Sequence, residues 1–324
     1  MSDIAAIRAA AQRLNGVVRR TPLLHAPFLD ELAGRKVYVK AEALQLTGSF
    51  KFRGGWSALS ALDDAAKARG VIAYSSGNHA QGVALAAQRL GIPAVIIMPA
   101  DAPKVKVENT RAYGAEVVFY DRANGEDRDA LGTRLGNNRG LTLIPPFDHP
   151  EVIAGQGTTG LELAEQAREV GVRTADVLVC CGGGGLTSGI ALALEAEAPG
   201  LRVRPCEPER FDDVTRSLSS GTPQTNEAPS GSICDAILTP SPGALTWPIL
   251  KRLCGPGLVV SDADCLRAVK TAFETLRLVL EPGGAAGLAA ALTHPNDIDG
   301  DAVIVVATGG NVDASVFTKA LEMS

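Results

Sequence analysis

The chain has 324 residues, of which 46% are hydrophobic and 4% aromatic, and its formal net charge is −5. This length suits one large domain or two ordinary ones, with enough apolar content for a sizeable core. The acidic balance argues against a nucleic-acid surface, which needs a basic patch. No apolar run approaches the roughly 18 residues of a membrane span. The N-terminus lacks the pattern of a signal peptide, so we expect a cytoplasmic protein.

The cysteines show no C-x-x-C pair that would indicate a metal or redox motif. Two of them are adjacent within an apolar, strand-like run, where cysteine behaves as a small hydrophobic residue. We therefore expect reduced thiols, as is usual in the cytosol. The residues concerned are Cys180, Cys181, Cys206, Cys234, Cys254 and Cys265.

The N-terminal region mixes helix and strand. Ser2 or Asp3 can cap a helix that stops at Gly16. Residues 36–40 alternate like a half-buried strand. A further helix is expected to begin at Lys51, directly behind a Gly-Ser pair and an aromatic residue.

From residue 71 onward, strands and helices alternate. Such alternation implies parallel strands joined by helical crossovers. A proline-rich segment, residues 145–150, interrupts the pattern, and we predict a domain boundary there. The alternation then resumes, with a polar surface loop at residues 219–232. We expect strands at 71–74, 94–98, 116–120, 177–181, 203–206 and 302–306, and helices at 80–90, 104–113, 126–135, 153–170, 186–197, 262–280 and 285–292.

These elements predict an α/β protein with two open parallel-sheet domains. The larger domain would contain residues 1–69 and 147–324. The smaller domain would contain residues 70–146.

Four consecutive glycines, Gly182 to Gly185, join a buried apolar run to a predicted helix. This arrangement places unpaired N–H groups at the positive end of a helix, with no side chains to block an anion. A plain tight turn is the alternative, but four glycines lose much backbone entropy on folding. We therefore favour a phosphate-binding loop, although its sequence matches no nucleotide motif.

Two further polar turns follow predicted strands. Residues 75–79 (Ser-Ser-Gly-Asn-His) could hold a carboxylate, or could simply cap the next helix. His79 by itself is as often structural as catalytic. Residues 308–311 (Thr-Gly-Gly-Asn) form another such turn. Because α/β sheets bind ligands beyond the carboxyl ends of their strands, the three turns together indicate a binding site.

Lys51 lies between Phe50 and Phe52. An isolated lysine is most often a solvated surface charge. Apolar, crowded neighbours change this expectation, because they lower the pKa of the amine and make the neutral nucleophile available. An amine combined with a phosphate-binding loop suggests an aldehyde-phosphate cofactor, and pyridoxal 5′-phosphate (PLP) fits.

Five segments now resemble one known group of proteins, the serine/threonine dehydratase family. This is the tryptophan-synthase-β-like (fold type II) group of PLP enzymes, which includes serine racemase and hydroxyaspartate dehydratase. The resemblance covers nearly the whole chain, in the family's order. It implies a cofactor in the cleft between the two domains, a small amino-acid substrate and a homodimer. The segments are Gly48 to Gly54, Ser75 to His79, Ala154 to Thr158, Gly182 to Gly185, and Gly309 to Asp313.

The resemblance also implies roles for individual residues. Lys51 would be the Schiff-base lysine, and Ser76 a second acid/base on the opposite face of the cofactor. Thr308 would face the pyridine nitrogen; its hydroxyl cannot protonate that nitrogen firmly, which suits β-elimination over transamination. The cofactor would contact Phe50, Lys51, Asn78, Gly182, Gly183, Gly184, Gly185 and Thr308. The substrate would contact Ser75, Ser76, Asn78, His79, Arg128 and Thr239.

A divalent cation is a second expectation from the resemblance. Glu207, Phe211 and Asp213 match the cation site of the racemase branch, which uses two carboxylates and a backbone carbonyl. Oxygen ligands suit Mg²⁺, Ca²⁺ or Mn²⁺, and we expect Mg²⁺. Acidic residues at the start of a helix are the alternative.

The family's shared reaction is loss of water and ammonia from a 2-amino-3-hydroxy acid. Residues 120–122 and 126–128 are similar to a Tyr-Asp-Arg…Glu-Asp-Arg pattern of hydroxyaspartate dehydratases. Arg128 could bind a second substrate carboxylate with two hydrogen bonds, although a solvated, charged helix start is the alternative.

We therefore predict a PLP-dependent carbon–nitrogen lyase that converts 3-hydroxyaspartate to oxaloacetate. Serine racemase and threonine/serine dehydratase are the alternatives, and a non-catalytic phosphate-binding module is a remote one. Thr239 stands where serine racemase has a serine, which argues against racemase specificity.

Overall fold

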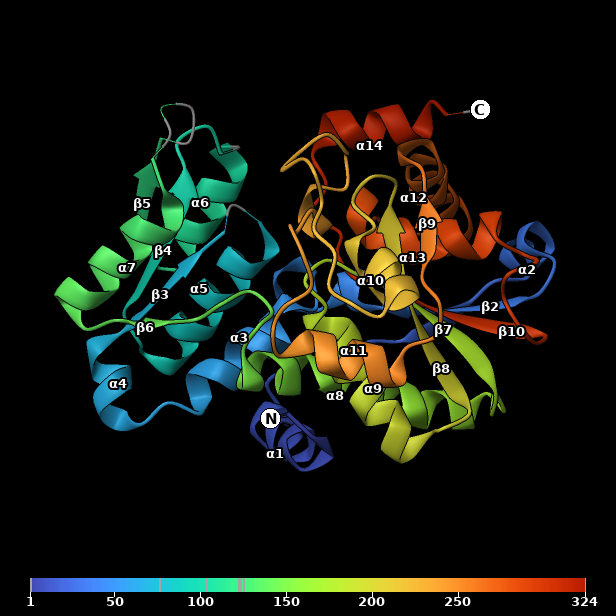
Figure 1. Ribbon diagram of the computed structural model, residues 1–324, viewed down its shortest axis with the longest axis horizontal. Coiled ribbons are helices and arrows are strands. Elements are labelled where there is room, and N and C mark those ends of the chain that lie inside the picture. The colour runs from blue at the N-terminus through green and yellow to red at the C-terminus, as the bar shows by residue number, and fades with distance from the viewer. Residues whose placement is uncertain (1, 76, 103, 122–123, 125, 324) are drawn as a thin grey trace.

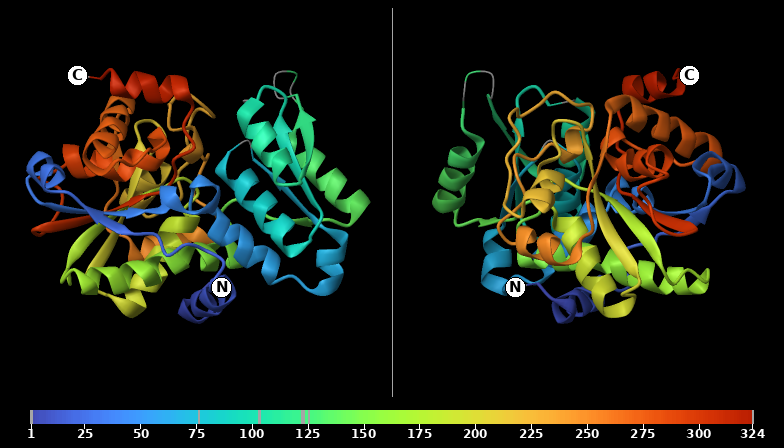
Figure 2. Two further views of the ribbon diagram at one scale, coloured as in Figure 1. Left: turned by 180° about the vertical axis from the view of Figure 1, so that it is seen from behind. Right: turned by 45° about the vertical axis from the view of Figure 1, so that its right-hand side comes forward.

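The computed structural model describes residues 2–75, 77–102, 104–121, 124 and 126–323. Two predicted residues, Ser76 and Arg122, lie outside this set. The described chain forms two β-sheets that lie side by side, each with helices on both faces (Figures 1 and 2). This arrangement confirms the predicted α/β fold with two parallel sheets.

The larger sheet has six strands in the order β1-β2-β10-β7-β8-β9. It is parallel except for β1, which pairs antiparallel with β2 at one edge. Alternating residues of β7 are buried on opposite faces, Val177 and Val179 on one and Leu178 and Cys180 on the other. Burial on both faces is typical of a parallel sheet between helical layers. The strands are β1 (Leu23–His25), β2 (Lys36–Ala41), β7 (Ala175–Cys180), β8 (Leu201–Pro208), β9 (Leu258–Val260) and β10 (Ala302–Ala307).

Helices cover both faces of this sheet (Figure 1). On one face, α8 (Pro150–Glu169) and α9 (Gly185–Glu197) contribute to the apolar core, and α1 (Ile4–Leu14) packs against them. The opposite face is covered by α2 (Pro27–Ala33), α12 (Asp262–Leu276), α13 (Pro282–Thr293) and α14 (Ala314–Leu321). The remaining helices of this part are α10 (Asp213–Ser220) and α11 (Thr246–Leu253).

The smaller sheet has four parallel strands in the order β5-β4-β3-β6. Its core residues separate in the same way: Ala73 and Ile96 pack with α5, and Ile72 and Ile97 pack with Leu131 of α7. The strands are β3 (Val71–Tyr74), β4 (Ala94–Pro99), β5 (Glu116–Tyr120) and β6 (Thr142–Leu143), and the helices are α4 (Asp64–Arg69), α5 (Asn78–Leu90), α6 (Lys104–Ala112) and α7 (Arg128–Arg139).

The helix that begins at Lys51, α3 (Lys51–Ser60), lies between the two sheets (Figure 1). Its Phe52 and Leu59 belong to the hydrophobic cluster of the smaller sheet, together with Val71. We predicted that residues 1–69, and therefore α3, belong to the larger domain. Helix α3 packs against the smaller sheet, and its Arg53 also pairs with Glu162 of α8, so it contacts both parts of the molecule. The division into domains itself stays a prediction.

All the predicted strands are present, and the differences lie at helix ends and in short elements. Helix α12 ends at Leu276 rather than at residue 280, because Arg277 adopts a left-handed conformation with φ 59°. Helix α7 begins at Arg128 rather than at residue 126. The sequence patterns did not indicate α10, α11 or α14, whose eight residues each give too few repeats of the helical period.

Among the described residues, none of the helices has both the length and the apolar character needed to cross a bilayer. All six cysteines belong to the described residues, and none forms a disulfide. Five of them are buried, in agreement with the expectation of buried thiols.

Candidate active site

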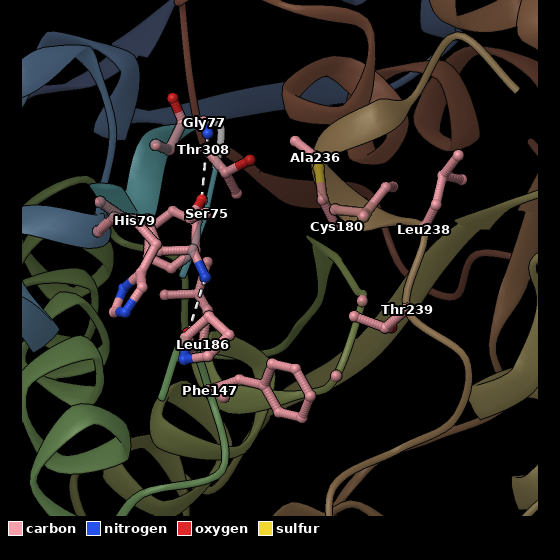
Figure 3. Close-up of a pocket in the computed structure, with 18 of the residues that line it drawn as sticks. Ser75, Gly77, His79, Phe147, Cys180, Leu186, Ala236, Leu238, Thr239 and Thr308 are labelled. Carbon is pink, nitrogen blue, oxygen red and sulfur yellow. Dashed lines mark hydrogen bonds between the residues drawn. The ribbon is translucent and has the colours of Figure 1, made fainter. Parts of the chain in front are cut away.

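A single pocket gathers the described residues that we predicted to bind cofactor and substrate. It lies beyond the carboxyl ends of β3, β7 and β10, where ligands bind in α/β sheets. Figure 3 shows Ser75, Gly77 and His79 facing Cys180 and Thr239 across this pocket. Ser76 lies outside the described residues. The predicted residues that line the pocket are Phe50, Lys51, Ser75, Asn78, His79, Arg128, Gly182 to Gly185, Thr239 and Thr308.

Backbone hydrogen bonds join the segment before Lys51 to the turn after β10. The Phe50 N–H donates to the Thr308 carbonyl at 3.2 Å, and the Gly310 N–H donates to the Gly48 carbonyl at 2.9 Å. Gly48 has φ +73°, and a Cβ there would lie 2.5 Å from Oδ1 of Asn311. Glycine is therefore required at this position for both conformation and space.

The Lys51 amine lies at the pocket wall. Its Nζ donates to the Pro146 carbonyl at 2.8 Å and lies 5.1 Å from the centre of the Phe50 ring. Burial lowers the pKa of Lys51 to about 8, although the nearby Glu281 opposes this shift. The lowered pKa provides a useful fraction of neutral, nucleophilic amine near neutral pH.

A buried ionic network fixes the helix that carries this amine. Arg53, two residues after Lys51, donates to Glu42 at 2.8 Å and to Glu162 at 2.8 Å. Lys40 donates to the same Glu162 at 2.5 Å. Arg53, Glu42 and Lys40 are fully buried, so removing one partner would leave an uncompensated charge in the interior. In the sequence, Arg53 was noted only as part of the segment Gly48 to Gly54, without a role of its own.

The tetraglycine loop begins α9 and is packed too tightly for side chains. A Cβ at Gly183 would lie 2.3 Å from the Phe147 ring. Gly184 has φ +88°, and a Cβ there would lie 2.7 Å from Leu250. The buried Thr187 hydroxyl, in the first turn of α9, has no hydrogen-bond partner among the described residues. Helix N–H groups and an unpaired hydroxyl form a donor set that fits a phosphate.

His79 is neutral in this setting. Its Nε2–H donates to the Ile144 carbonyl at 2.8 Å, which leaves Nδ1 as an acceptor. Burial and the Lys51 charge lower the pKa of His79 to about 3. His79 is therefore a hydrogen-bonding group and not a proton donor at neutral pH.

Two cations lie at the mouth of the pocket, on the side of the smaller sheet. Arg128, the first residue of α7, is exposed and stacks its guanidinium 4.5 Å from the centre of the Tyr74 ring. Lys106 of α6 lies 3.5 Å from Asp235, which belongs to the opposite side of the pocket. Lys106 is thus paired with a carboxylate, and Arg128 places a guanidinium at this end of the pocket.

The pocket residues that were not predicted from the sequence include Gln156, Glu281 and Lys106. Both amide atoms of the buried Gln156 have no partner among the described residues, which indicates a ligand beside them. Gln156 belongs to the Ala154 to Thr158 segment that we had noted, without a role. Glu281 directly precedes the Pro-Gly-Gly start of α13, and this placement beside a glycine-rich helix start is the signal that could have found it.

The predicted cation residues lie apart from this pocket, at the end of β8, at the start of α10 and in the segment that joins them. The two carboxylate oxygens of Glu207 accept from the N–H groups of Val214 and Thr215 at 3.0 and 2.7 Å. Asp213 accepts from Asn226, but its Oδ2 is buried without a partner among the described residues. Burial and the Asp213 charge raise the pKa of Glu207 to about 8, and burial raises that of Asp213 to about 7. Within the described part of the chain, three or more acidic, His or Cys side chains do not converge on one point.

Comparison with known proteins agrees with this geometry. A family model described as pyridoxal-phosphate dependent enzyme matches residues 14–309. An L-threo-3-hydroxyaspartate ammonia-lyase from Pseudomonas sp is 44% identical over 313 residues, which are 97% of this chain and 96% of that protein. A serine racemase from Schizosaccharomyces pombe is 40% identical over 315 residues, with coverages of 97% and 96%.

A solved structure supports the same assignment. A threonine deaminase from T.th. is 44% identical, has a TM-score of 0.90, and is matched over 96% of this chain and 99% of that one. The predicted fold type and family are thereby confirmed. This chain belongs to the family of pyridoxal-phosphate dependent enzymes.

Proposed function

We propose that this chain is a PLP-dependent ammonia-lyase that converts 3-hydroxyaspartate to oxaloacetate and ammonia. The observation that carries this proposal is one pocket lined by the Lys51 amine, the tetraglycine loop and the guanidinium of Arg128. The 44% identity to an L-threo-3-hydroxyaspartate ammonia-lyase supports the same substrate class.

The pocket residues fit the cofactor and the reaction as follows. When bound, PLP supplies an aldehyde that condenses with amines and a ring that withdraws electrons from the substrate's α-carbon. The tetraglycine loop and Thr187 would hold its phosphate, and Thr308 would offer the ring an uncharged hydroxyl. Lys51 would remove the α-proton, since its pKa of about 8 leaves neutral amine near neutral pH. The 3-hydroxyl would then leave as water, and hydrolysis of the dehydrated product would give the keto acid and ammonia.

The charge of the pocket mouth supports a substrate with a second carboxylate. Neither L-serine nor L-threonine carries an anion on its side chain, so neither would use the guanidinium of Arg128. A planar guanidinium binds a carboxylate through two parallel hydrogen bonds. We therefore infer that Arg128 separates hydroxyaspartate from the neutral hydroxy amino acids.

The substrate is tested by measuring ammonia release from erythro- and threo-3-hydroxyaspartate, L-serine, D-serine and L-threonine with the purified protein. We expect the highest kcat/KM for a hydroxyaspartate. A higher value for L-threonine would favour a threonine dehydratase, and interconversion of L- and D-serine would favour a racemase. A protein without the visible absorbance of bound PLP would overturn the whole proposal in favour of a non-catalytic module.

We further propose that Glu207, Asp213 and the Phe211 carbonyl hold a divalent cation such as Mg²⁺. The unpaired Oδ2 of Asp213 and the two adjacent buried carboxylates fit a hard cation, which would compensate their charge. This site lies outside the reaction pocket, so its expected role is structural. A homodimer stays an expectation from the family resemblance, and a cytoplasmic location stays an expectation from the N-terminal sequence pattern.

Removal of the cation should therefore lower thermal stability. We expect a chelator to reduce Tm by about 5 °C, and excess Mg²⁺ to restore it, from the usual scale of ligand-linked stability. The Asp213→Asn variant should have a low Tm that no longer responds to chelator. The exposed Glu209→Gln on the same segment should respond like the wild type. An unchanged Tm after chelation of the wild type would count against a cation at this site.

A further inference from the structure

The ring of Tyr74 lies where the smaller sheet meets the pocket. Tyr74 is the last residue of β3, and its backbone pairs with that of Ile97 in the neighbouring β4. Successive side chains of a strand point to opposite faces, so Tyr74, like Ile72, faces α7, whereas Ala73 between them faces α5. Helices α5 and α7 lie on opposite faces of this sheet (Figure 1). Tyr74 therefore lines the pocket and packs against α7 at the same time.

A glycine in α7 leaves room for this ring. A Cβ at Gly132 would lie 3.5 and 3.8 Å from two carbons of the Tyr74 ring, so the ring lies close against the helix backbone. Arg128 is four residues before Gly132 in the same helix. Residues four apart lie on one face of a helix. Helix α7 thus presents Arg128 and the space that Tyr74 fills on the same side.

The contact between Arg128 and Tyr74 follows from this arrangement. Cζ of Arg128 lies 4.5 Å from the centre of the Tyr74 ring. The face of an aromatic ring attracts a cation through its electron cloud. A guanidinium donates hydrogen bonds only through the N–H groups at its edges, which match the two oxygens of a carboxylate. Contact with the ring is therefore compatible with binding of a carboxylate by the same guanidinium.

Arg128 gains from such a contact because it is exposed. A long side chain at the surface samples many rotamers, and a carboxylate that binds it must order it at a cost in conformational entropy. A ring that already holds the guanidinium at the pocket reduces this cost. The Tyr74 ring can do so because it is itself packed against Leu131 and Gly132.

We propose that Tyr74 is a positioning residue for substrate specificity. Its ring holds the guanidinium of Arg128 at the pocket, where the guanidinium binds the second carboxylate of 3-hydroxyaspartate. This inference rests on the proposed function, because it requires a substrate that carries this carboxylate. Tyr74 does not touch the reacting atoms; it acts through Arg128, and the ring rather than the hydroxyl produces the effect.

The test compares the holoenzymes of Tyr74→Leu and the wild type with 3-hydroxyaspartate and with L-serine. Leucine fills apolar space but offers no ring face to a cation. We expect KM for 3-hydroxyaspartate to rise about three- to fivefold, the scale of a cation–π contact at an exposed site, with kcat little changed. Loss of binding that is equal in the ground state and the transition state appears in KM and not in kcat. KM for L-serine should stay at its wild-type value.

Inhibition constants give a readout that does not depend on elimination. L-Aspartate has both carboxylates but no 3-hydroxyl to lose, and L-alanine lacks the second carboxylate as well. We expect Ki for L-aspartate to rise in Tyr74→Leu by the same factor as KM for 3-hydroxyaspartate, while Ki for L-alanine stays unchanged. Equal rises in both inhibition constants would overturn the inference, since Tyr74 would then support the pocket as a whole.

Two comparisons separate the ring from the hydroxyl and from effects that bypass Arg128. Tyr74→Phe keeps the ring and should have wild-type constants. A loss as large as that of Tyr74→Leu would overturn the inference in favour of a hydrogen bond from the hydroxyl. Added to Arg128→Met, Tyr74→Leu should cause no further loss for 3-hydroxyaspartate, because the two residues act as one unit. An additive loss would also overturn the inference.

Phe119→Leu is the matched control for removal of a ring. It removes the ring beneath Arg111, and neither residue belongs to the described residues that line the pocket. Every constant should stay at its wild-type value, and a rise in KM equal to that of Tyr74→Leu would overturn the inference. The Tm of each holoenzyme checks the fold. Tyr74→Met provides a second variant without a ring if Tyr74→Leu is unstable.

Failure of this inference differs from failure of the proposed function. If Arg128→Met loses the preference for 3-hydroxyaspartate over L-serine and Tyr74→Leu keeps it, only the role of Tyr74 is wrong. If the wild type shows no such preference, both proposals are wrong.

Discussion

Lys51→Ala should retain the fold but lose both the covalent attachment of PLP and about 10³- to 10⁴-fold of the elimination rate, the scale expected for a base removed from a reacting centre. Lys51 is the first residue of α3 and its amine contacts only the Pro146 carbonyl and the Phe50 ring in the described structure. The substitution removes no buried ion pair. The visible absorbance of the protein with PLP, and a rate of ammonia release, measure the two losses.

The control for this prediction is Lys319→Ala, an exposed lysine in α14. It should leave absorbance and rate unchanged. Partial recovery of Lys51→Ala by an added small amine would show that the missing group is a base and not a structural contact. A Lys51→Ala protein that still forms a reducible covalent adduct with PLP would contradict our assignment of this lysine.

Arg128→Met should lower kcat/KM for 3-hydroxyaspartate by about 10- to 100-fold, from the loss of charge-assisted hydrogen bonds worth about 1.5–3 kcal/mol. The effect on L-serine should be less than about twofold, because serine has no second carboxylate for the guanidinium to bind. Methionine keeps an apolar contact with the Tyr74 ring, which the guanidinium now covers. The ratio of the two kcat/KM values is the quantity to measure.

Arg111→Met provides a matched control. Arg111 is exposed, lies on α6 of the same part of the molecule, and also stacks on an aromatic ring, that of Phe119 at 5.6 Å. Arg111 does not belong to the residues that line the pocket. Its substitution should leave the substrate ratio unchanged. If Arg128→Met lowers kcat/KM equally for serine and hydroxyaspartate, Arg128 supports the pocket but does not bind the second carboxylate.

The main features of the fold follow from local patterns in the sequence. Buried strands such as 302–306 are continuous apolar runs, and glycine-rich turns mark their carboxyl ends. These signals lie within a few consecutive residues, so a single sequence carries them. They also identify the tetraglycine loop and Lys51, since a run of glycines and a lysine between two aromatics are unusual by themselves.

What the sequence did not indicate depends on contacts between distant residues. Glu281 accepts a hydrogen bond from Asn78, which is 203 positions away in the sequence. The buried Arg53 donates to Glu162, which is 109 positions away. Lys106 is one of two lysines on α6, and only the folded structure shows that its side chain lies opposite Asp235. The spacing of residues along the sequence does not predict such pairs, because they form only when distant segments pack together in the fold.

The pairing of β2 with β10 has a consequence for how the protein is made. Strand β2 is synthesised before its parallel partner β10 and before the Thr308 carbonyl that receives the Phe50 N–H, and a large sequence separation lies between them. Contacts of such large sequence separation form late, because their loop-closure entropy must be overcome first. The lysine therefore leaves the ribosome long before its pocket exists. Binding of PLP should therefore require synthesis and folding at least through β10. A chain interrupted before β10 would carry the reactive amine without a complete site for the cofactor.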